Sequence, residues 1–87
     1  MEIEFDPAKS RLNLAKHGVD LGRAVELDIR GVFADRRRDY GEPRFLAFGL
    51  IDGVPHCLAF TVRGDKVRAI SLRRAHRKEF ERYVETE

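Results

Sequence analysis

Residues 44–74, RFLAFGLIDGVPHCLAFTVRGDKVRAISLRR, decide the fold. Two turn dipeptides, Asp52-Gly53 and Gly64-Asp65, each stand between apolar runs, and this pattern is the strongest short-range signal of a two-residue β-hairpin. The stretch therefore predicts three antiparallel strands. Because a two-residue turn fixes the strand register, the sequence also predicts which side chains lie opposite one another.

The predicted register lines up basic side chains across the three strands. Pairing outward from the two turns places Arg44 opposite Thr61, Thr61 opposite Arg68, and His56 opposite Arg73. Side chains alternate between the two faces of a sheet. One predicted face carries the rows Leu46–Ala59–Ile70 and Phe48–Cys57–Leu72, and the other carries Phe45–Phe60–Ala69, Ala47–Leu58–Ser71 and Gly49–His56–Arg73. Both faces are thus apolar in the middle and basic at one end.

The charge of the chain is unevenly distributed along its 87 residues, which suffice for a single domain spanning residues 1–87. The formal net charge of +2 combines −2 in residues 1–29, +7 in residues 30–78 and −3 in residues 79–87. The predicted sheet is therefore the electropositive part, and a polyanion is its natural ligand. The alternative is that these arginines only solubilise a surface.

Cysteine usage and hydropathy exclude several classes of protein. The single cysteine, Cys57, lies inside a predicted strand, so neither a disulfide framework nor a zinc-binding spacing is present and we expect a small core residue. The apolar runs are only as long as strands, and no signal peptide is recognisable. We therefore expect a cytoplasmic protein without membrane contact.

The flanking segments predict one short strand, three helices and one further strand. A strand at residues 3–5 precedes Asp6-Pro7, which is a helix start, and Gly18 is typical of a helix end. The apolar stripe of this first helix is expected at Leu12, Leu14 and Ala15. Asp20 caps a second helix, whose expected buried residues are Leu21, Ala24, Val25 and Leu27.

The remaining elements complete an α+β fold. A strand at residues 32–34 precedes a polar loop at 35–43, and a last helix at about 75–84 precedes an acidic tail. The predicted order is β-α-α-β-β-β-β-α, with two N-terminal helices and one C-terminal helix packed on a mostly antiparallel sheet.

Two groups of residues resemble a known family. The first half contains Phe5-Asp6-Pro7-x-Lys9, Asn13 and Lys16-His17-Gly18-Val19, and the second half contains Glu42-x-Arg44, Gly49, Arg68-x-Ile70-Ser71-x-Arg73-Arg74-Ala75, Glu79 and Tyr83. At this separation they resemble BrnT-type toxins over nearly the whole chain. Phe5 stands where the family often has Trp, and Leu72 stands where Ala is usual; both are exchanges between apolar residues.

The resemblance implies a fold and a function that periodicity alone does not. It implies a fold related to RelE-type ribonuclease toxins, cleavage of RNA and arrest of translation. It also implies neutralisation by a BrnA-like ribbon-helix-helix antitoxin, and binding to operator DNA only through the complex with that antitoxin.

RNA cleavage needs no metal or other cofactor, because the 2′-OH can attack the adjacent phosphate when cations stabilise the phosphorane and a base and an acid move the protons. The acids of the basic segment fall in predicted loops and turns rather than in one strand row, so we expect a metal-independent mechanism. The candidate catalytic residues are Lys16, His17, Arg63, Arg68, Arg73 and Arg74. The candidate RNA-binding residues are Lys9, Arg36, Arg37, Arg38 and Arg44.

Each of these residues also has a plainer interpretation. A Lys-His pair at a helix end often only complements the helix dipole, and single surface arginines often form weak ion pairs. Asn13 shares a helix face with Lys9 and is expected either to contact RNA or to tie down a loop. His56, His76 and Tyr83 are weaker candidates for proton transfer.

Two other functions fit the sequence less well. A non-catalytic module could bind RNA on the basic sheet, but Phe45 and Phe60 are expected to be buried rather than available for stacking. A helix-turn-helix around Gly18 is disfavoured because the second helix is acidic, with Arg23 as its only base. A purely structural partner protein is the third alternative.

Overall fold

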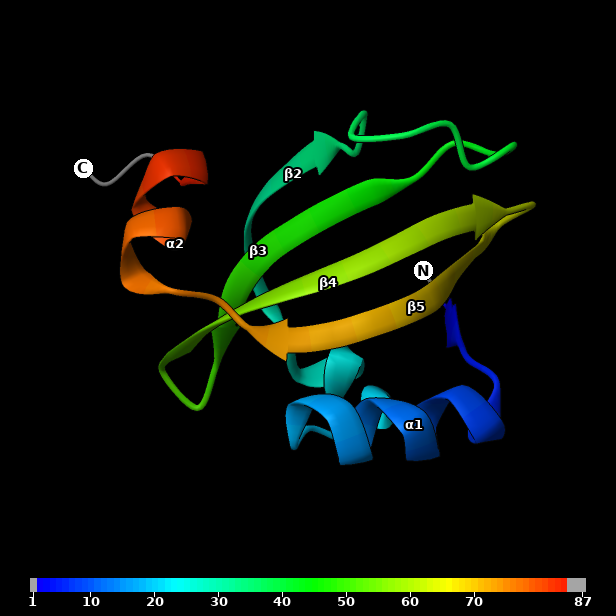
Figure 1. Ribbon diagram of the computed structural model, residues 1–87, viewed down its shortest axis with the longest axis horizontal. Helices are drawn as coiled ribbons and strands as arrows, with labels where there is room; N and C mark the ends of the chain where they lie inside the picture. The colour runs from blue at the N-terminus through cyan, green and yellow to red at the C-terminus, as the bar shows by residue number, and fades with distance from the viewer. Residues whose placement is uncertain (1, 85–87) are drawn as a thin grey trace.

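The computed structural model describes residues 2–84, which form a five-stranded sheet with helices at its margins (Figure 1). The elements in chain order are β1 (Glu2–Glu4), α1 (Pro7–His17), the 3₁₀ helix η1 (Leu21–Glu26), β2 (Asp28–Ala34), β3 (Phe45–Ile51), β4 (Val54–Arg63), β5 (Lys66–Arg74) and α2 (Arg77–Tyr83). The sheet order is β1-β5-β4-β3-β2. Only β1 and β5 run parallel, so the expected α+β class with a mostly antiparallel sheet is confirmed. The acidic tail lies outside the described residues.

The predicted register of β3 and β4 is confirmed along its whole length. Every pair from Ile51↔Val54 to Phe45↔Phe60 matches the pairing counted from the first turn. That turn places both Asp52 and Gly53 at positive φ, 52° and 74°, as a tight hairpin with the right-handed twist of the strands requires.

The predicted register of β4 and β5 is correct only next to its turn. The pairs from Arg63↔Lys66 to Phe60↔Ala69 match the prediction, but Ala59 then pairs with Ser71, so Ile70 is an extra residue in a bulge. The expected pairing of His56 with Arg73 is therefore wrong. His56 lies opposite Arg74, and Arg73 lies opposite Cys57.

The bulge exchanges the two faces of β5 beyond Ile70. Leu72 joins the core cluster that contains Ala47 and Leu58, where Ser71 was expected. Arg73 moves to the opposite face, which η1 does not cover. The exchange buries a leucine in place of a serine, and it leaves the guanidinium accessible to solvent.

The first helix has the expected ends but not the expected buried stripe. Asp6 accepts the Ala8 N–H at 2.9 Å, and Gly18 ends the helix at φ 73°. Leu12 and Leu14, however, are 69% and 51% exposed, so the prediction of an apolar stripe on this helix is wrong. Leucines two positions apart on a helix do not share a face. The one buried residue of α1 is Asn13.

Asn13 attaches α1 to the sheet through hydrogen bonds. Its side-chain NH₂ donates to the carbonyl oxygens of Val19 and Leu72, each at 2.8 Å, and its Oδ1 accepts the Leu72 N–H at 3.0 Å. The amide thus takes the place that a neighbouring strand would take beside this stretch of β5. Of the two roles expected for Asn13, the structure shows the one that ties down a loop, because Val19 lies just after the helix.

A 3₁₀ helix stands where a second α-helix was expected. Arg23 and Leu27 donate their N–H groups to the carbonyls three residues earlier. With three residues per turn, Leu21 and Ala24 share one side and are buried, whereas Val25 is 69% exposed. The expected pair of N-terminal α-helices is therefore not confirmed, and the expected burial of Val25 is wrong.

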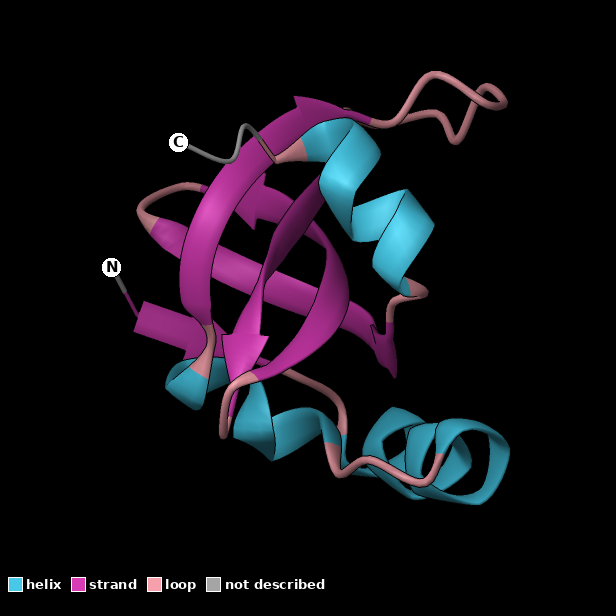
Figure 2. Ribbon diagram, turned by 90° about the vertical axis from the view of Figure 1, so that its left-hand side faces the viewer, coloured by secondary structure: helices cyan, strands magenta, loops and turns pink. Residues whose placement is uncertain are grey.

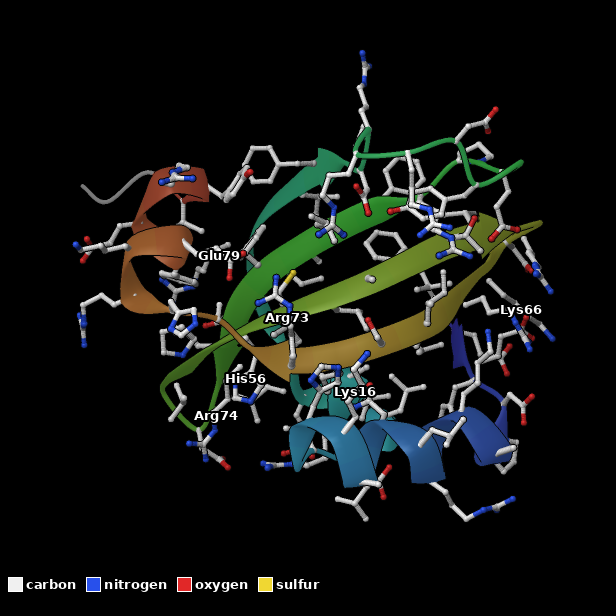
Figure 3. The ribbon with its side chains drawn as sticks, in the orientation of Figure 1. Lys16, His56, Lys66, Arg73, Arg74 and Glu79 are labelled. Carbon is white, nitrogen blue, oxygen red and sulfur yellow. The ribbon has the colours of Figure 1, made fainter. Side chains whose placement is uncertain are left out.

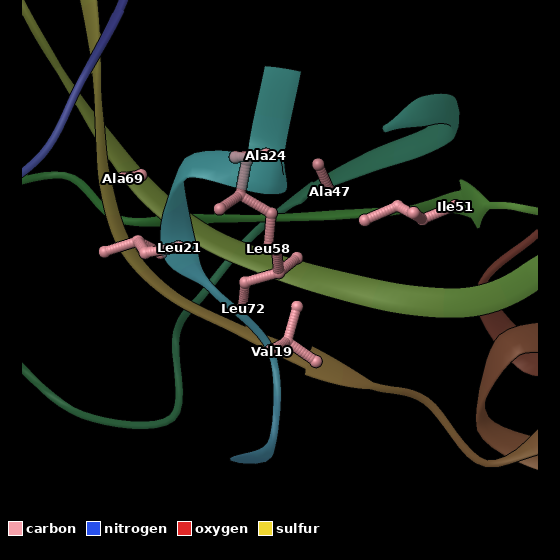
Figure 4. Close-up of a cluster of buried hydrophobic side chains, with 8 residues drawn as sticks. All are labelled: Val19, Leu21, Ala24, Ala47, Ile51, Leu58, Ala69 and Leu72. Carbon is pink, nitrogen blue, oxygen red and sulfur yellow. The ribbon is translucent and has the colours of Figure 1, made fainter. Parts of the chain in front are cut away.

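The two faces of the sheet are covered to different extents. On one face, Val19 and η1 contribute to a cluster with residues of β3, β4 and β5: Val19, Leu21, Ala24, Ala47, Ile51, Leu58, Ala69 and Leu72 (Figure 4). On the other face, Phe80 and Val84 pack against Leu46, Phe48 and Cys57 at one end. Figures 1 and 2 agree that α1 and α2 stand at separate margins of this second face, and most of β5 between them is left without a helix above it.

Candidate active site

Arg73 occupies the open face at the end of β5 nearest α2. Glu79, in the first turn of α2, accepts both terminal nitrogens of the Arg73 guanidinium at 2.8 and 3.0 Å. Both side chains are about one-third exposed. A bidentate pair of this kind fixes the plane of the guanidinium while leaving its outer edge accessible to a phosphate.

Lys16 and His17 lie in the last turn of α1, and Figure 3 shows Lys16 below the sheet on the same side as Arg73. Partial burial, followed by the charges of Lys16 and Arg73, lowers the pKa of His17 below its ordinary value of 6.5. These three residues therefore come together from two distant parts of the chain. The imidazole is neutral near pH 7 and lies close to two cations.

Arg37 adds a third cation to this region. Arg37 belongs to the loop between β2 and β3, and its guanidinium donates to both oxygens of Asp35 at 2.8 Å. Tyr40 donates to the same carboxylate at 3.0 Å, and the side chain of Asp35 is only 3% exposed. These bonds hold the pKa of Asp35 well below its usual range. The pKa of Arg73 is raised, chiefly by its hydrogen bonds to Glu79, and the nearby positive charge of Arg37 opposes that rise only slightly.

Cys57 lies under these groups as part of the sheet. It is buried, as expected, and burial raises its pKa to about 11. The side chain is therefore a neutral thiol at physiological pH, and it contributes a small apolar floor rather than a nucleophile.

Arg44, Arg63 and Arg68 lie toward the other end of the sheet. Arg44 and Arg63 both pair with Glu42, at 3.4 and 3.6 Å, and Arg68 pairs with Glu4 of β1 at 3.4 Å. Arg68 and Arg73 are roughly 16 Å apart along the strand, from the rise of an extended chain. The structure thus brings Arg44 and Arg63 together through one carboxylate but does not bring this set to His17.

Arg74 and His56 also lie apart from Arg73. Adjacent residues of a strand point to opposite faces, and Figure 3 shows Arg74 directed away from Glu79, near His56. His56 is 4% exposed, and its Nδ1 is 2.7 Å from the carbonyl oxygen of Val54. His56 is therefore held within the sheet.

The other RNA-binding candidates are exposed. Lys9 lies on α1 and Arg36 in the loop, both at the surface. Arg38 is placed over the ring of Tyr40, 5.5 Å from its centroid, and Arg44 covers the same ring at 4.3 Å. Phe45 and Phe60 stack on each other with ring centroids 5.4 Å apart, and Phe60 packs against the core cluster. Both rings are only partly buried, whereas we expected them to be buried from the sequence.

Two positioning residues were not among the sequence-based candidates. Glu79 orients Arg73, and Asp35 orients Arg37. A glutamate in the first turn of a helix ordinarily suggests a dipole partner. Its role here depends on where α2 packs and on the bulge that turns Arg73 toward it, and neither is visible in a local pattern.

Two further properties concern the described residues alone. Across residues 2–84, no three or more His, Cys, Asp or Glu side chains gather as a metal-binding group. In the same range, no helix combines the length and the apolar character needed to span a bilayer.

Comparison with known proteins identifies a family. Residues 5–79 match the family described as the ribonuclease toxin, BrnT, of a type II toxin-antitoxin system. Comparison with curated proteins gives no match. The matched range covers most of the chain and includes Lys16, His17, Arg73 and Glu79. The chain therefore belongs to the BrnT family of ribonuclease toxins, and a toxin of this type has an antitoxin partner.

Proposed function

Because the chain belongs to the BrnT family, we propose that it cleaves RNA without a metal ion, at the site formed by Lys16, His17 and Arg73. One observation carries the proposal. A helix end and a strand end bring a neutral imidazole and two cations together on an open face, and a carboxylate fixes the guanidinium.

The attacking step needs a base. We assign this role to His17, because a lowered pKa keeps its imidazole unprotonated and able to accept the 2′-OH proton near pH 7. The 2′-oxygen then forms a bond to phosphorus, and the bond from phosphorus to the 5′-oxygen breaks. The products are a 2′,3′-cyclic phosphate and a 5′-hydroxyl. DNA lacks the 2′-OH and would not react.

Stabilising the negative charge that develops on the phosphorane is usually the largest contribution to catalysis of this kind. Arg73 is already oriented by Glu79, so its free edge can bind phosphate oxygens with little reorganisation. Lys16 supplies a second positive charge and the proton for the leaving 5′-oxygen. Arg37, held by Asp35, attracts the RNA backbone toward this face.

Metal independence is supported by what the nearby carboxylates do. Glu79 and Asp35 are each engaged by a guanidinium, with their pKa values lowered by those arginines. Both carboxylates are therefore already hydrogen-bonded to arginines, which supports a mechanism in which neither holds a metal ion.

The test is incubation of the purified chain with RNA, with and without EDTA, followed by mass spectrometry of the fragment ends. We expect cleavage to persist in EDTA and to leave 2′,3′-cyclic phosphates. Cleavage abolished by EDTA and restored by Mg²⁺ would overturn the metal-independent mechanism. RNA that is bound but left intact would instead favour a non-catalytic binding module.

Several wider features of the family belong to the same proposal. We propose that cleavage in the cytoplasm arrests translation, that the fold is related to RelE-type toxins, and that the antitoxin is a BrnA-like ribbon-helix-helix protein. Binding to operator DNA would then occur only through the antitoxin complex. The sheet edge at β2 offers this antitoxin an apolar surface, since Ile29 and Val32 are 53% and 50% exposed. Growth arrest on induction of the chain alone, relieved by the antitoxin, checks this.

A further inference from the structure

A cleft of about 540 Å³ lies between α1 and the bulged part of β5. Its apolar walls are Leu12 of α1 and Ile70 of the bulge, and Lys9, Lys16 and Ser71 supply its polar lining. The volume lies within the usual range for small-ligand sites, which are mainly apolar with a few polar groups. His17 also lines it, so the cleft opens directly onto the proposed catalytic site.

The local backbone explains why these apolar side chains remain unburied. Asn13 bonds to Leu72 and Val19, and it is the only residue of α1 that is buried. The helix is therefore attached by an amide rather than by an apolar stripe. Leu12 remains 69% exposed, and the extra residue of the bulge, Ile70, lines the cleft with it.

The charges around the cleft indicate what it accepts. Lys9 and Lys16 are seven residues apart on α1, so they lie on one side of the helix, about 10 Å apart along its axis. Within residues 2–84 neither lysine forms an ion pair, and the cleft lining contains no carboxylate. A ligand with anionic groups flanking an apolar, flat group complements this arrangement.

We propose that the cleft seats the nucleobase of a nucleotide adjoining the scissile phosphate, between Leu12 and Ile70, and thereby sets the base preference of cleavage. Lys9 and Lys16 bind the phosphates on either side, and the Ser71 hydroxyl donates to or accepts from an edge of the base. Single-stranded RNA presents unstacked bases in this way. The inference rests on the proposed function, because it assigns the cleft to the substrate of the same site.

The experiment compares two leucines of the same helix. Leu12 lines the cleft, whereas Leu14, which is 51% exposed, does not, so Leu14→Ala is the matched control for Leu12→Ala. Each variant would be assayed by sequencing the cleavage sites in a random-sequence RNA. Its affinity would also be measured for 2′-deoxy-substituted oligonucleotides, which bind without being cleaved.

We expect Leu12→Ala to lower kcat/KM for the preferred sequence by about tenfold and to flatten the base preference, as removal of apolar contacts from a pocket does. Affinity for the uncleavable oligonucleotide should fall with it, and Leu14→Ala should change neither quantity. For Lys9→Gln, the slope of log affinity against log salt should fall by about 0.7, the value for one phosphate contact in a single strand.

The possible outcomes distinguish the proposed base-binding role of the cleft from the proposed cleavage activity. A Leu12-dependent affinity without any cleavage would support the cleft and overturn the proposed activity. Cleavage with an unchanged base profile in Leu12→Ala would overturn the cleft and leave the activity standing. If Leu12→Ala weakens only binding of the antitoxin, the cleft is a protein-docking surface and the proposal is wrong. If Leu14→Ala reproduces every effect, the effects do not arise in the cleft and the proposal is wrong as well.

Discussion

The two ends of β5 both carry arginines but differ in what surrounds them. At the Lys66 end, Arg63 and Arg68 pair with carboxylates of the loop and of β1. At the other end, Arg73 is oriented by Glu79 and lies near His17. His56 and His76 also belong to this end, opposite Arg74 and at the start of α2. The number of arginines therefore does not locate a site, whereas an oriented cation beside a titratable group does.

The largest expected effect is a contrast between Arg73 and Arg68. Replacing Arg73 with Gln removes the oriented cation, and we expect kcat for RNA cleavage to fall by about 10³-fold, as loss of a preorganised charge-stabilising group does. Arg68→Gln, the matched change at the other end of the strand, should stay within about threefold, since Arg68 pairs with Glu4 of β1 and lies away from His17. Single-turnover cleavage assays measure both. Equal losses would remove the distinction between the two ends.

The attachment of α1 is expected to dominate the stability of the catalytic end. Asn13→Ala deletes three hydrogen bonds and leaves the polar backbone groups of Leu72 and Val19 without partners, so the free energy of unfolding should fall by roughly 3 kcal/mol. Urea denaturation measures this change. Thr61→Val, at the other end, deletes a single bond to the Pro43 carbonyl and should cost about 1 kcal/mol. A smaller loss for Asn13→Ala than for Thr61→Val would contradict the role given to the amide.

Substitution of Glu79 tests whether Arg73 must be oriented as well as present. We expect Glu79→Gln to lower kcat by about tenfold with little change in KM, because the guanidinium remains but its geometry loosens. Glu81→Gln, an exposed change on the same helix, is the control. Steady-state kinetics on one oligonucleotide separate kcat from KM, and a rise in KM with kcat unchanged would place Glu79 in substrate binding instead.

The smallest expected difference lies within the arginine run of the loop. Arg37 is held by Asp35 beside the site, so Arg37→Gln should reduce kcat/KM about fivefold at low salt and less at high salt. Arg36→Gln, at an exposed neighbouring position, should change it less than about twofold. Measurement of kcat/KM for both variants at two ionic strengths checks this difference. Identical effects would mean that only the net charge of the loop matters.

Most of the elements, the second helix excepted, and most of the strand pairing could be predicted from local signals. Asp52-Gly53 set the register of β3 and β4 because a two-residue turn fixes the pairing next to it and no bulge interrupts these two strands, and Asp6, Pro7 and Gly18 marked the ends of α1 correctly. The bulge could not be predicted. It brings Leu72 rather than Ser71 into the core, which is a tertiary gain with no glycine or proline signal at Ile70.

The candidate site was predictable as a set of residue types rather than as a geometry. Lys16, His17 and Arg73 were all named from the sequence, but so were Arg63, Arg68 and Arg74, which the structure places elsewhere. Which of these arginines lies at the site depends on the bulge, because one added residue exchanges the faces of Arg73 and Arg74. It also depends on α1 being attached through Asn13, which an apolar-stripe argument cannot anticipate.

The central claim is that His17 is a neutral base beside Lys16 and Arg73, and its titration by NMR tests this most directly. We expect the pKa of His17 to lie below 6.5, to rise in Arg73→Gln, where one of its neighbouring cations is removed, and to match the acid limb of kcat/KM in the wild-type chain. Because a protonated imidazole cannot accept the 2′-OH proton, cleavage should fall as the pH drops through that lowered pKa. A His17 that titrates at or above 6.5, or an acid limb that does not follow it, would contradict the account.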